Sequence, residues 1–326
     1  MKTFLKVACI VGAFLTLSAA ANAADATLLI PDAIIRIPGS KGKFDFLSVD
    51  PTQNRLLAAH EKDETADFID LKSGTVLARL KVGPAVGIAA DETAGKYYVS
   101  VQDDKRVAVI DAKTLTEISS ISTPAETDAI LYDEKDGRVY VTNDNGKYLW
   151  AIDPVAGKVV AAIAVPDGPE CMAYDVAKDR IYMNSKVHDQ VVVIDTKSNT
   201  VVTQWSTGVA KGPHGLVLDA KANRIYVSGD NGNLVAIDTQ TGQVVGATKI
   251  TPKVDQIAFD ASTHLIFCAG PDHLSVVRAT AAGVEFVGNV DSATTAKNVA
   301  VDPATHNVWT TYTDGTDSFA KSWRQP

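Results

Sequence analysis

Residues 224–238 read RIYVSGDNGNLVAID, and this stretch decides the fold. The run Arg224–Ser228 is rich in β-branched and aromatic residues and predicts one strand, and Asn233–Ile237 predicts a second. Between them, the pair Asn231-Gly232 favours the tight turn that joins two antiparallel strands, because both residues tolerate a positive φ. The stretch therefore predicts a β-hairpin.

The same hairpin recurs along the chain. An aspartate precedes each copy at steps of 41 to 44 residues, and the seven aspartates are Asp50, Asp91, Asp133, Asp175, Asp219, Asp260 and Asp302. In the fifth copy we expect four strands, at residues 215–218, 224–228, 233–237 and 243–247. A period near 42 residues that is filled with short strands is typical of propeller blades. The sequence thus predicts an all-β fold, a seven-bladed β-propeller of four-stranded antiparallel blades.

The seventh copy is one strand short. After Asp302, residues 308–311 and 318–323 are strand-like, whereas the strand-like segment 27–37 has no copy of its own. We expect this N-terminal segment to supply the outer strand of the last blade, because closing the ring removes an exposed sheet edge. Since every unit of a closed repeat protein stacks on its neighbours, residues 24–326 are expected to form a single domain.

Residues 1–23 have the features of a secretory signal peptide. Lys2 and Lys6 precede the apolar stretch 7–17, and Ala21-Asn22-Ala23 forms a small-residue cleavage site. The apolar stretch is shorter than the roughly 20 residues that span a bilayer. We therefore expect a periplasmic product without a membrane anchor.

Charge and cysteine content argue against several classes of function. The formal net charge is −8 at pH 7, which disfavours nucleic-acid binding, because that binding depends on Lys and Arg. Cys171 and Cys268 are expected on different sheets two blades apart, too far for the roughly 7 Å between Cα atoms that a disulfide allows. We expect two separate buried thiols. The sequence contains no haem-attachment motif, phosphate-binding loop or nucleophile-elbow motif.

The repeat resembles that of the YVTN-repeat β-propellers, the YncE-like group. The residues that carry the resemblance are Tyr140-Val141-Thr142-Asn143, Tyr226-Val227-Ser228 and the Val-x-Val-Ile-Asp segments that end at Asp111 and Asp195. The resemblance covers residues 44–312 and implies the propeller fold. Proteins of this type include periplasmic binding or scaffold proteins, propeller parts of redox enzymes, and lactone-acting hydrolases or lyases. Because one fold hosts many activities, the resemblance selects no function.

One column of the repeat is rich in ionisable residues. The residues five positions before the repeat aspartates lie in the loops that enter the innermost strands, at one mouth of the channel, and they are Asp45, Val86, Asp128, Glu170, His214, Asp255 and Lys297. Carboxylates near one axis raise each other's pKa unless a cation compensates. We expect an acidic pocket in which Asp45, Asp128, Glu170 and Asp255 hold Ca²⁺ or Mg²⁺. The alternative is that these residues are solvated loop residues around a water-filled hole.

His214 is the candidate general base of this pocket. It lies in the short segment Gly212-Pro213-His214-Gly215, where glycine lets a ligand approach the backbone, and a neutral imidazole accepts protons near pH 7. An ordinary hydrogen-bonded histidine is the alternative. Further candidates for the rim of the pocket, mostly from the loops between second and third strands, are His60, Asn143, Lys186, His188, Lys297 and Tyr312.

Two functions fit these features. The first is a binding or scaffold protein, expected to be a monomer, whose channel face binds a small ligand, a metal ion or a protein partner. The lack of a recognisable catalytic constellation favours it. The second is a metal-assisted lactonase- or lyase-type enzyme, in which Ca²⁺ or Mg²⁺ polarises a carbonyl and His214 accepts a proton. Binding of single-stranded nucleic acid needs basic and aromatic residues on one face, so the acidic column disfavours it.

Overall fold

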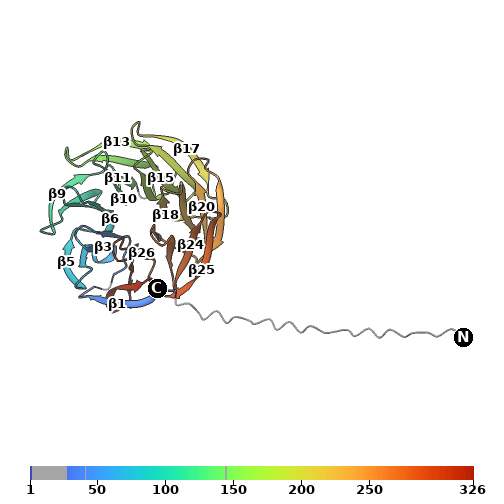
Figure 1. The fold of residues 1–326 in the computed structure, drawn as a ribbon. Helices are drawn as coiled ribbons and strands as arrows, with labels where there is room; N and C mark the ends of the chain where they lie inside the picture. Colours follow the sequence, from blue (N-terminus) through green and yellow to red (C-terminus); the bar gives the residue numbers. More distant parts are fainter. Residues whose placement is uncertain (2–27, 41, 144) are drawn as a thin grey trace.

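Seven four-stranded antiparallel sheets surround a central channel in the computed structural model, which describes residues 1, 28–40, 42–143 and 145–326 (Figure 1). Each sheet is one blade of a β-propeller. Within these ranges the helical structure is one turn of 3₁₀ helix, η1 (Glu61–Asp63). No helix in the described part of the chain is long and apolar enough to cross a membrane. The expected signal peptide, apart from Met1, lies outside the described residues.

Each blade runs from an innermost strand at the channel to an outermost strand at the rim. The innermost strands are β2 (Leu47–Asp50), β6 (Ala85–Asp91), β10 (Thr127–Asp133), β14 (Pro169–Asp175), β18 (Pro213–Asp219), β22 (Gln256–Asp260) and β26 (Asn298–Val301). The second strands are β3 (Arg55–His60), β7 (Lys96–Val101), β11 (Arg138–Asn143), β15 (Arg180–Ser185), β19 (Arg224–Gly229), β23 (Leu265–Gly270) and β27 (Val308–Thr313).

The outer half of each blade follows the same order. The third strands are β4 (Thr65–Asp70), β8 (Arg106–Asp111), β12 (Tyr148–Asp153), β16 (Gln190–Asp195), β20 (Asn233–Asp238), β24 (His273–Thr280) and β28 (Ser318–Arg324). The outermost strands are β5 (Thr75–Lys81), β9 (Thr116–Ser122), β13 (Lys158–Ala164), β17 (Thr200–Ser206), β21 (Val244–Lys249), β25 (Gly283–Asp291) and β1 (Ile30–Ile37). The four strands expected in the fifth copy are all present, with bounds that differ by one or two residues.

The last blade joins the two ends of the chain. β1 pairs antiparallel with β28, with Ile37 opposite Ser318 and Ile30 opposite Arg324. Ile37 is fully buried in a core that also contains Leu56 of the first blade. In Figure 1 the blue strand β1 lies beside the C-terminus. The prediction that the N-terminal segment completes the seventh blade is confirmed.

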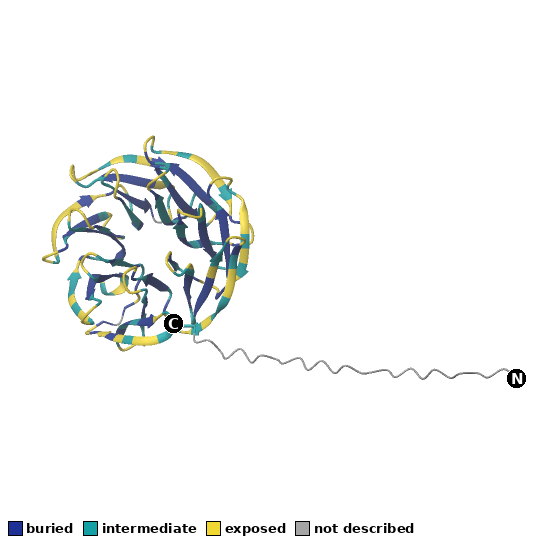
Figure 2. Cartoon of the chain, in the orientation of Figure 1, coloured by how far each residue is buried: buried dark blue, intermediate teal, exposed yellow. Residues whose placement is uncertain are grey.

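The hydrophobic core lies between neighbouring blades. Both faces of the inner strands are covered, whereas the outermost strands are exposed (Figure 2). The recurrent aromatic residues expected to pack between blades are at most 2% exposed, and they are Tyr98, Tyr140, Tyr182, Tyr226, Phe267 and Trp309. Sheets packed on both faces explain why the strands are almost continuously apolar. Cys171 and Cys268 are buried and unpaired, as expected.

The repeat aspartate joins a turn to the next blade. In the first blade, Asp50 Oδ1 accepts hydrogen bonds from the backbone N–H groups of Thr52 (2.9 Å) and Gln53 (3.0 Å). Its Oδ2 accepts a hydrogen bond of 2.7 Å from the hydroxyl of Tyr97 in the second blade. All seven repeat aspartates are buried. A buried carboxylate needs such partners, which gives the repeat aspartate a structural role.

Candidate functional site

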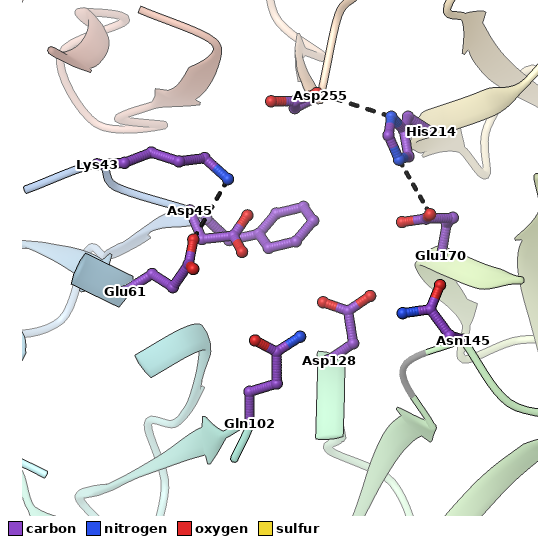
Figure 3. A pocket seen from close by; sticks show the side chains of 10 residues that line it. Lys43, Asp45, Glu61, Gln102, Asp128, Asn145, Glu170, His214 and Asp255 are labelled. Carbon is purple, nitrogen blue, oxygen red and sulfur yellow. Dashed lines mark hydrogen bonds and ion pairs between the residues drawn. The ribbon is translucent and has the colours of Figure 1, made fainter. Parts of the chain in front are cut away.

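Five residues of the predicted column line one cavity at a mouth of the channel. This cavity, here called the mouth cavity, has a volume of about 320 Å³. Figure 3 shows the labelled side chains around a common space. The column residues among those that line it are Asp45, Asp128, Glu170, His214 and Asp255. Residues separated by more than 200 positions in the sequence are thus brought together.

The start of the innermost strand positions each of these side chains. Asp128, Glu170 and His214 are the second residues of β10, β14 and β18, and Asp255 immediately precedes β22. In β10, β14 and β18 the pairing with the second strand of the blade shifts register across the column residue. The shifts lie between Thr127 and Ile130, between Pro169 and Met172, and between Pro213 and Leu216. Such bulges bend a strand and re-aim side chains. A repeated bulge therefore accompanies the repeated column.

His214 lies among carboxylates. Its Nε2 is 2.9 Å from Oε1 of Glu170, and its Nδ1 is 3.3 Å from Oδ1 of Asp230 and 3.7 Å from Oδ1 of Asp255. Burial lowers the pKa of His214, but the hydrogen bond and negative charge of Glu170, together with the charge of Asp230, raise it, and the pKa is raised overall. Lys186 opposes this shift. The site therefore favours a protonated imidazole.

The carboxylate of Asp45 differs from its neighbours in the contacts that it makes. Among the described residues, no hydrogen bond or ion pair reaches its carboxylate oxygens. Burial, together with the charges of Glu61, Asp255 and Glu170, raises the pKa of Asp45 to about 7, although Lys43 lowers it. The Asp45 carboxyl therefore holds a proton more readily than an ordinary aspartate does.

Other acidic groups of the site are paired with lysines. Lys43 Nζ is 3.3 Å from Oε2 of Glu61, and Lys297 Nζ is 3.4 Å from Oδ2 of Asp255. Burial opposes the charge of Lys43, yet nearby Asp45 and Glu61 raise its pKa overall. The cavity therefore contains both signs of charge, with carboxylates in excess.

The metal assignment finds no direct support in the geometry. Among the described residues, no group of three or more His, Cys, Asp or Glu side chains is arranged to hold a metal ion. Asp45, Asp128, Glu170 and Asp255 share the cavity wall without forming such a group. Their role as Ca²⁺ or Mg²⁺ ligands, and that of His214 as a general base, stay predictions.

His60 is not a rim residue, and this expectation was wrong. Its side chain is fully buried, with Nδ1 2.8 Å from Oδ2 of Asp67 and Nε2 3.0 Å from the carbonyl oxygen of Gly42. Its ring stacks on Phe44 at a centroid distance of 3.8 Å. The segment before the first blade covers this histidine, which the repeat pattern does not reveal.

The other rim candidates divide into two groups. Lys186 and Lys297 belong to the site, since Lys186 Nζ lies 2.7 Å from Nε2 of His214. Asn143 was wrongly placed at the rim, because it is nearly buried and donates a hydrogen bond of 3.1 Å to the Glu126 carbonyl. His188 is exposed outside the cavity wall. Tyr312 is half-buried and stacks on Phe319 at 5.0 Å, outside the wall of the mouth cavity, and its role at the rim stays a prediction.

Four residues that line the mouth cavity were not predicted from the sequence, and they are Lys43, Phe46, Gln102 and Asn145. Lys43 and Phe46 flank the column residue Asp45, but the segment before β2 has no counterpart in the other repeats. Gln102 and Asn145 follow second strands, where the rim loops begin. Because the loops between second and third strands were expected at the rim, the position of Gln102 and Asn145 in these loops could have predicted their place in the cavity wall. Val86 of the column is apolar and buried and adds no charge.

Comparison with known proteins gives a family and the fold. The family profile described as "Domain of unknown function (DUF5074)" matches residues 89–284 of this chain. No curated protein matches the chain. These findings do not confirm the resemblance to the YVTN-repeat propellers.

Solved structures share the architecture at low sequence identity. A chain of the hydrazine synthase of Kuenenia stuttgartiensis superposes with a TM-score of 0.74 at 15% identity, covering 87% of this chain and 98% of that one. A chain of the mitotic checkpoint complex superposes with a TM-score of 0.79 at 13% identity, covering 98% of this chain and 99% of that one. At such identity the likeness shows the fold alone.

Proposed function

Since the chain belongs to the DUF5074 family, whose description assigns no activity, we propose from its geometry that it is a binding protein for a small, positively charged ligand. The site is the mouth cavity. The observation that supports this most is Asp45, a carboxylate that faces the cavity and has no hydrogen-bond or ion-pair partner among the described residues.

The charge of the site favours a cation. Glu61, Asp255 and Glu170 each have a positively charged or protonatable partner from the protein. Asp45 has no hydrogen-bond or ion-pair partner within the part of the chain that the structure describes, and those three carboxylates repel it. An unpaired buried charge costs free energy that a bound cation offsets. A ligand ammonium group would therefore bind where the protein leaves a carboxylate unsatisfied.

The size of the cavity favours a small ligand. Its volume of about 320 Å³ lies at the lower end of the range of roughly 300–1,000 Å³ found for small-molecule sites. The amide side chains of Gln102 and Asn145 also line the wall. Polar groups of this kind orient a ligand through hydrogen bonds.

Thermal unfolding and calorimetry test this proposal. We expect 1,4-diaminobutane, added as its hydrochloride, to raise the melting temperature of the protein, because a ligand that binds the folded state stabilises it. Asp255→Asn should weaken this shift. The control is Glu285→Gln, which removes an exposed carboxylate on the outermost strand β25. Calcium and magnesium chloride, with and without EDTA, test the metal ion as occupant.

The outcomes separate the two occupants. A shift with the diamine that Asp255→Asn reduces and Glu285→Gln preserves supports the proposal. A shift with Ca²⁺ or Mg²⁺ that EDTA reverses, without any response to amines, rejects it in favour of the metal site. No response to either kind of cation also rejects it.

We further propose that the protein is exported to the periplasm. The support is the order of basic, apolar and small residues in 1–23. Expression of the whole chain in a bacterial host, followed by fractionation and N-terminal sequencing, tests this. We expect the periplasmic product to begin at Ala24; an unprocessed protein in the cytoplasmic fraction would contradict export.

A further inference from the structure

Phe46 lies between two cavities of the channel. It lines the mouth cavity, and it also lines a second cavity of about 220 Å³ deeper in the channel, here called the lumen cavity. Apolar side chains of successive innermost strands contribute to the wall of the lumen cavity: Ile88, Ile130, Met172, Val217 and Ile257. Past Phe46 the carboxylates of the mouth cavity give way to these apolar side chains, together with the uncharged polar side chains of Ser48 and Gln256.

The backbone fixes Phe46 to the first two blades. Its N–H donates a hydrogen bond of 3.3 Å to the carbonyl of Val86, and its carbonyl accepts one of 3.0 Å from the N–H of Ala59. Its ring packs against the core cluster of the fourth and fifth blades, which contains Cys171 and Leu216. Those blades lie on the opposite side of the ring, so the Phe46 side chain reaches across the channel.

The lumen cavity suits an uncharged group. The amide of Gln256, which lines it, is occupied, since Nε2 donates to the Leu47 carbonyl (2.7 Å) and Oε1 accepts from the Leu47 N–H (3.0 Å). Burial and the nearby carboxylates raise the pKa of the Cys171 thiol well above its ordinary value, so the thiol stays neutral. Among the described residues that line the lumen cavity, the ionisable side chain is that of Cys171, and it carries no charge.

We propose that the ligand is an amphipathic organic ammonium compound, whose ammonium group binds beside Asp45 and Asp255 and whose apolar part lies along Phe46 into the lumen cavity. This inference rests on the proposed function and names its ligand class. A hard metal ion would use the carboxylates and leave Phe46 without a role. An alkylammonium ion uses both, because its charge pairs with carboxylates while its chain leaves water.

A series of primary amines tests the proposal. Ethylamine, butylamine and hexylamine, as ammonium ions at pH 7, are titrated into the protein by isothermal titration calorimetry. We expect the affinity to rise by about threefold to fourfold per methylene, the factor that burial of a methylene group gives. 1-Hexanol and hexanoate serve as neutral and anionic controls and should bind at least about tenfold more weakly than hexylamine, because they lack the charge that the carboxylates attract.

Variants assign the chain-length effect to Phe46. Phe46→Ala should weaken hexylamine binding by about tenfold and change ethylamine binding by less than about twofold, because only the longer chain reaches the ring. Phe46→Leu should keep most of the chain-length effect. Phe286→Ala is the matched control, since Phe286 is 43% exposed on the outermost strand β25. We expect the Phe286→Ala protein to bind all amines as the unaltered protein does.

The outcomes distinguish this inference from the proposed function. If all amines bind with equal affinity and Asp255→Asn weakens them, the cation site stands and the two-cavity inference is wrong. If hexanol binds as tightly as hexylamine, the ammonium group is irrelevant and both are wrong. The series on the unaltered protein decides the question even if Phe46→Ala does not fold.

Discussion

The ammonium group of Lys186 lies 2.7 Å from Nε2 of His214, the nitrogen that also lies 2.9 Å from Oε1 of Glu170. One ring nitrogen cannot serve both neighbours at once. When Nε2 carries a proton it donates to Glu170, and when it is bare it accepts from Lys186. In the second case the proton on Nδ1 faces Asp230, at 3.3 Å. The imidazole therefore exchanges partners when it titrates.

Replacing Glu170 should lower the pKa of His214. Burial and Lys186 both lower this pKa, whereas the hydrogen bond and negative charge of Glu170 raise it. The Glu170→Gln change removes that negative charge, so the lowering effects remain with less to offset them. Lys186→Met should act in the opposite direction and raise the pKa, because it removes a neighbouring positive charge. NMR titration of the imidazole ring of His214 measures both. Equal titration midpoints in the three proteins would contradict the proposed coupling.

The same pair makes stability depend on pH. The folded pKa of His214 is raised above the ordinary value of 6.5, so the folded state holds its proton more tightly than the unfolded chain does. The resulting stabilisation is complete below pH 6.5 and is lost as the pH rises through the folded pKa. We expect urea unfolding to show this loss in the unaltered protein and not in Glu170→Gln. The same loss in both would contradict the assignment.

Asp45→Asn should stabilise the protein at pH 8 and leave it unchanged at pH 4. The pKa of Asp45 is about 7 when folded and 3.8 ordinarily, so the folded state binds more protons and stability falls as the pH rises between these values. Because Asp45 is only half-buried, solvent screening reduces the effect, and we expect a gain of about 1–2 kcal/mol at pH 8. Chemical denaturation measures it, with Glu285→Gln as control. A gain that is equal at both pH values would show that charge is not its cause.

The fold was predictable because each copy of the repeat contains the strand and turn residues that specify one blade. The aspartate that follows or ends each innermost strand recurs at a nearly constant step, and in every copy it accepts a hydrogen bond from a backbone N–H of the next turn. The column before that aspartate was predictable for the same reason. Equal positions in equal blades face one axis, so Asp128, Glu170 and Asp255 had to meet.

What escaped prediction lies where the repeat is broken. The segment before β2 belongs to no blade, and it supplies Lys43 and Phe46 to the mouth cavity and the Phe44 ring that stacks on His60. Its path depends on tertiary packing across the channel. Spacing alone therefore placed His60 at the rim, although neighbouring segments bury it.

Gln256→Leu should destabilise the ring. Gln256 lies on the innermost strand of the sixth blade, and its side chain forms hydrogen bonds with the backbone N–H and carbonyl of Leu47 on the innermost strand of the first blade. Leucine keeps most of the volume but leaves the N–H and carbonyl of the buried residue Leu47 without these partners, which costs about 1–3 kcal/mol. Urea unfolding measures the loss. Gln240→Leu, at an exposed turn, is the control, and an equal effect of both changes would contradict the bridging role.

Closure of the ring by β1 should be visible in the stability of two neighbouring variants. Ile37 is fully buried between the last and first blades, whereas Ile34 on the same strand is 61% exposed. Ile37→Ala should reduce the free energy of unfolding by about 2–5 kcal/mol, the range for a buried isoleucine, and Ile34→Ala by less than about 1 kcal/mol. Both changes remove the same atoms, so their strand propensities cancel in the comparison. Equal losses in urea unfolding would mean that β1 does not pack as an integral strand of the seventh blade.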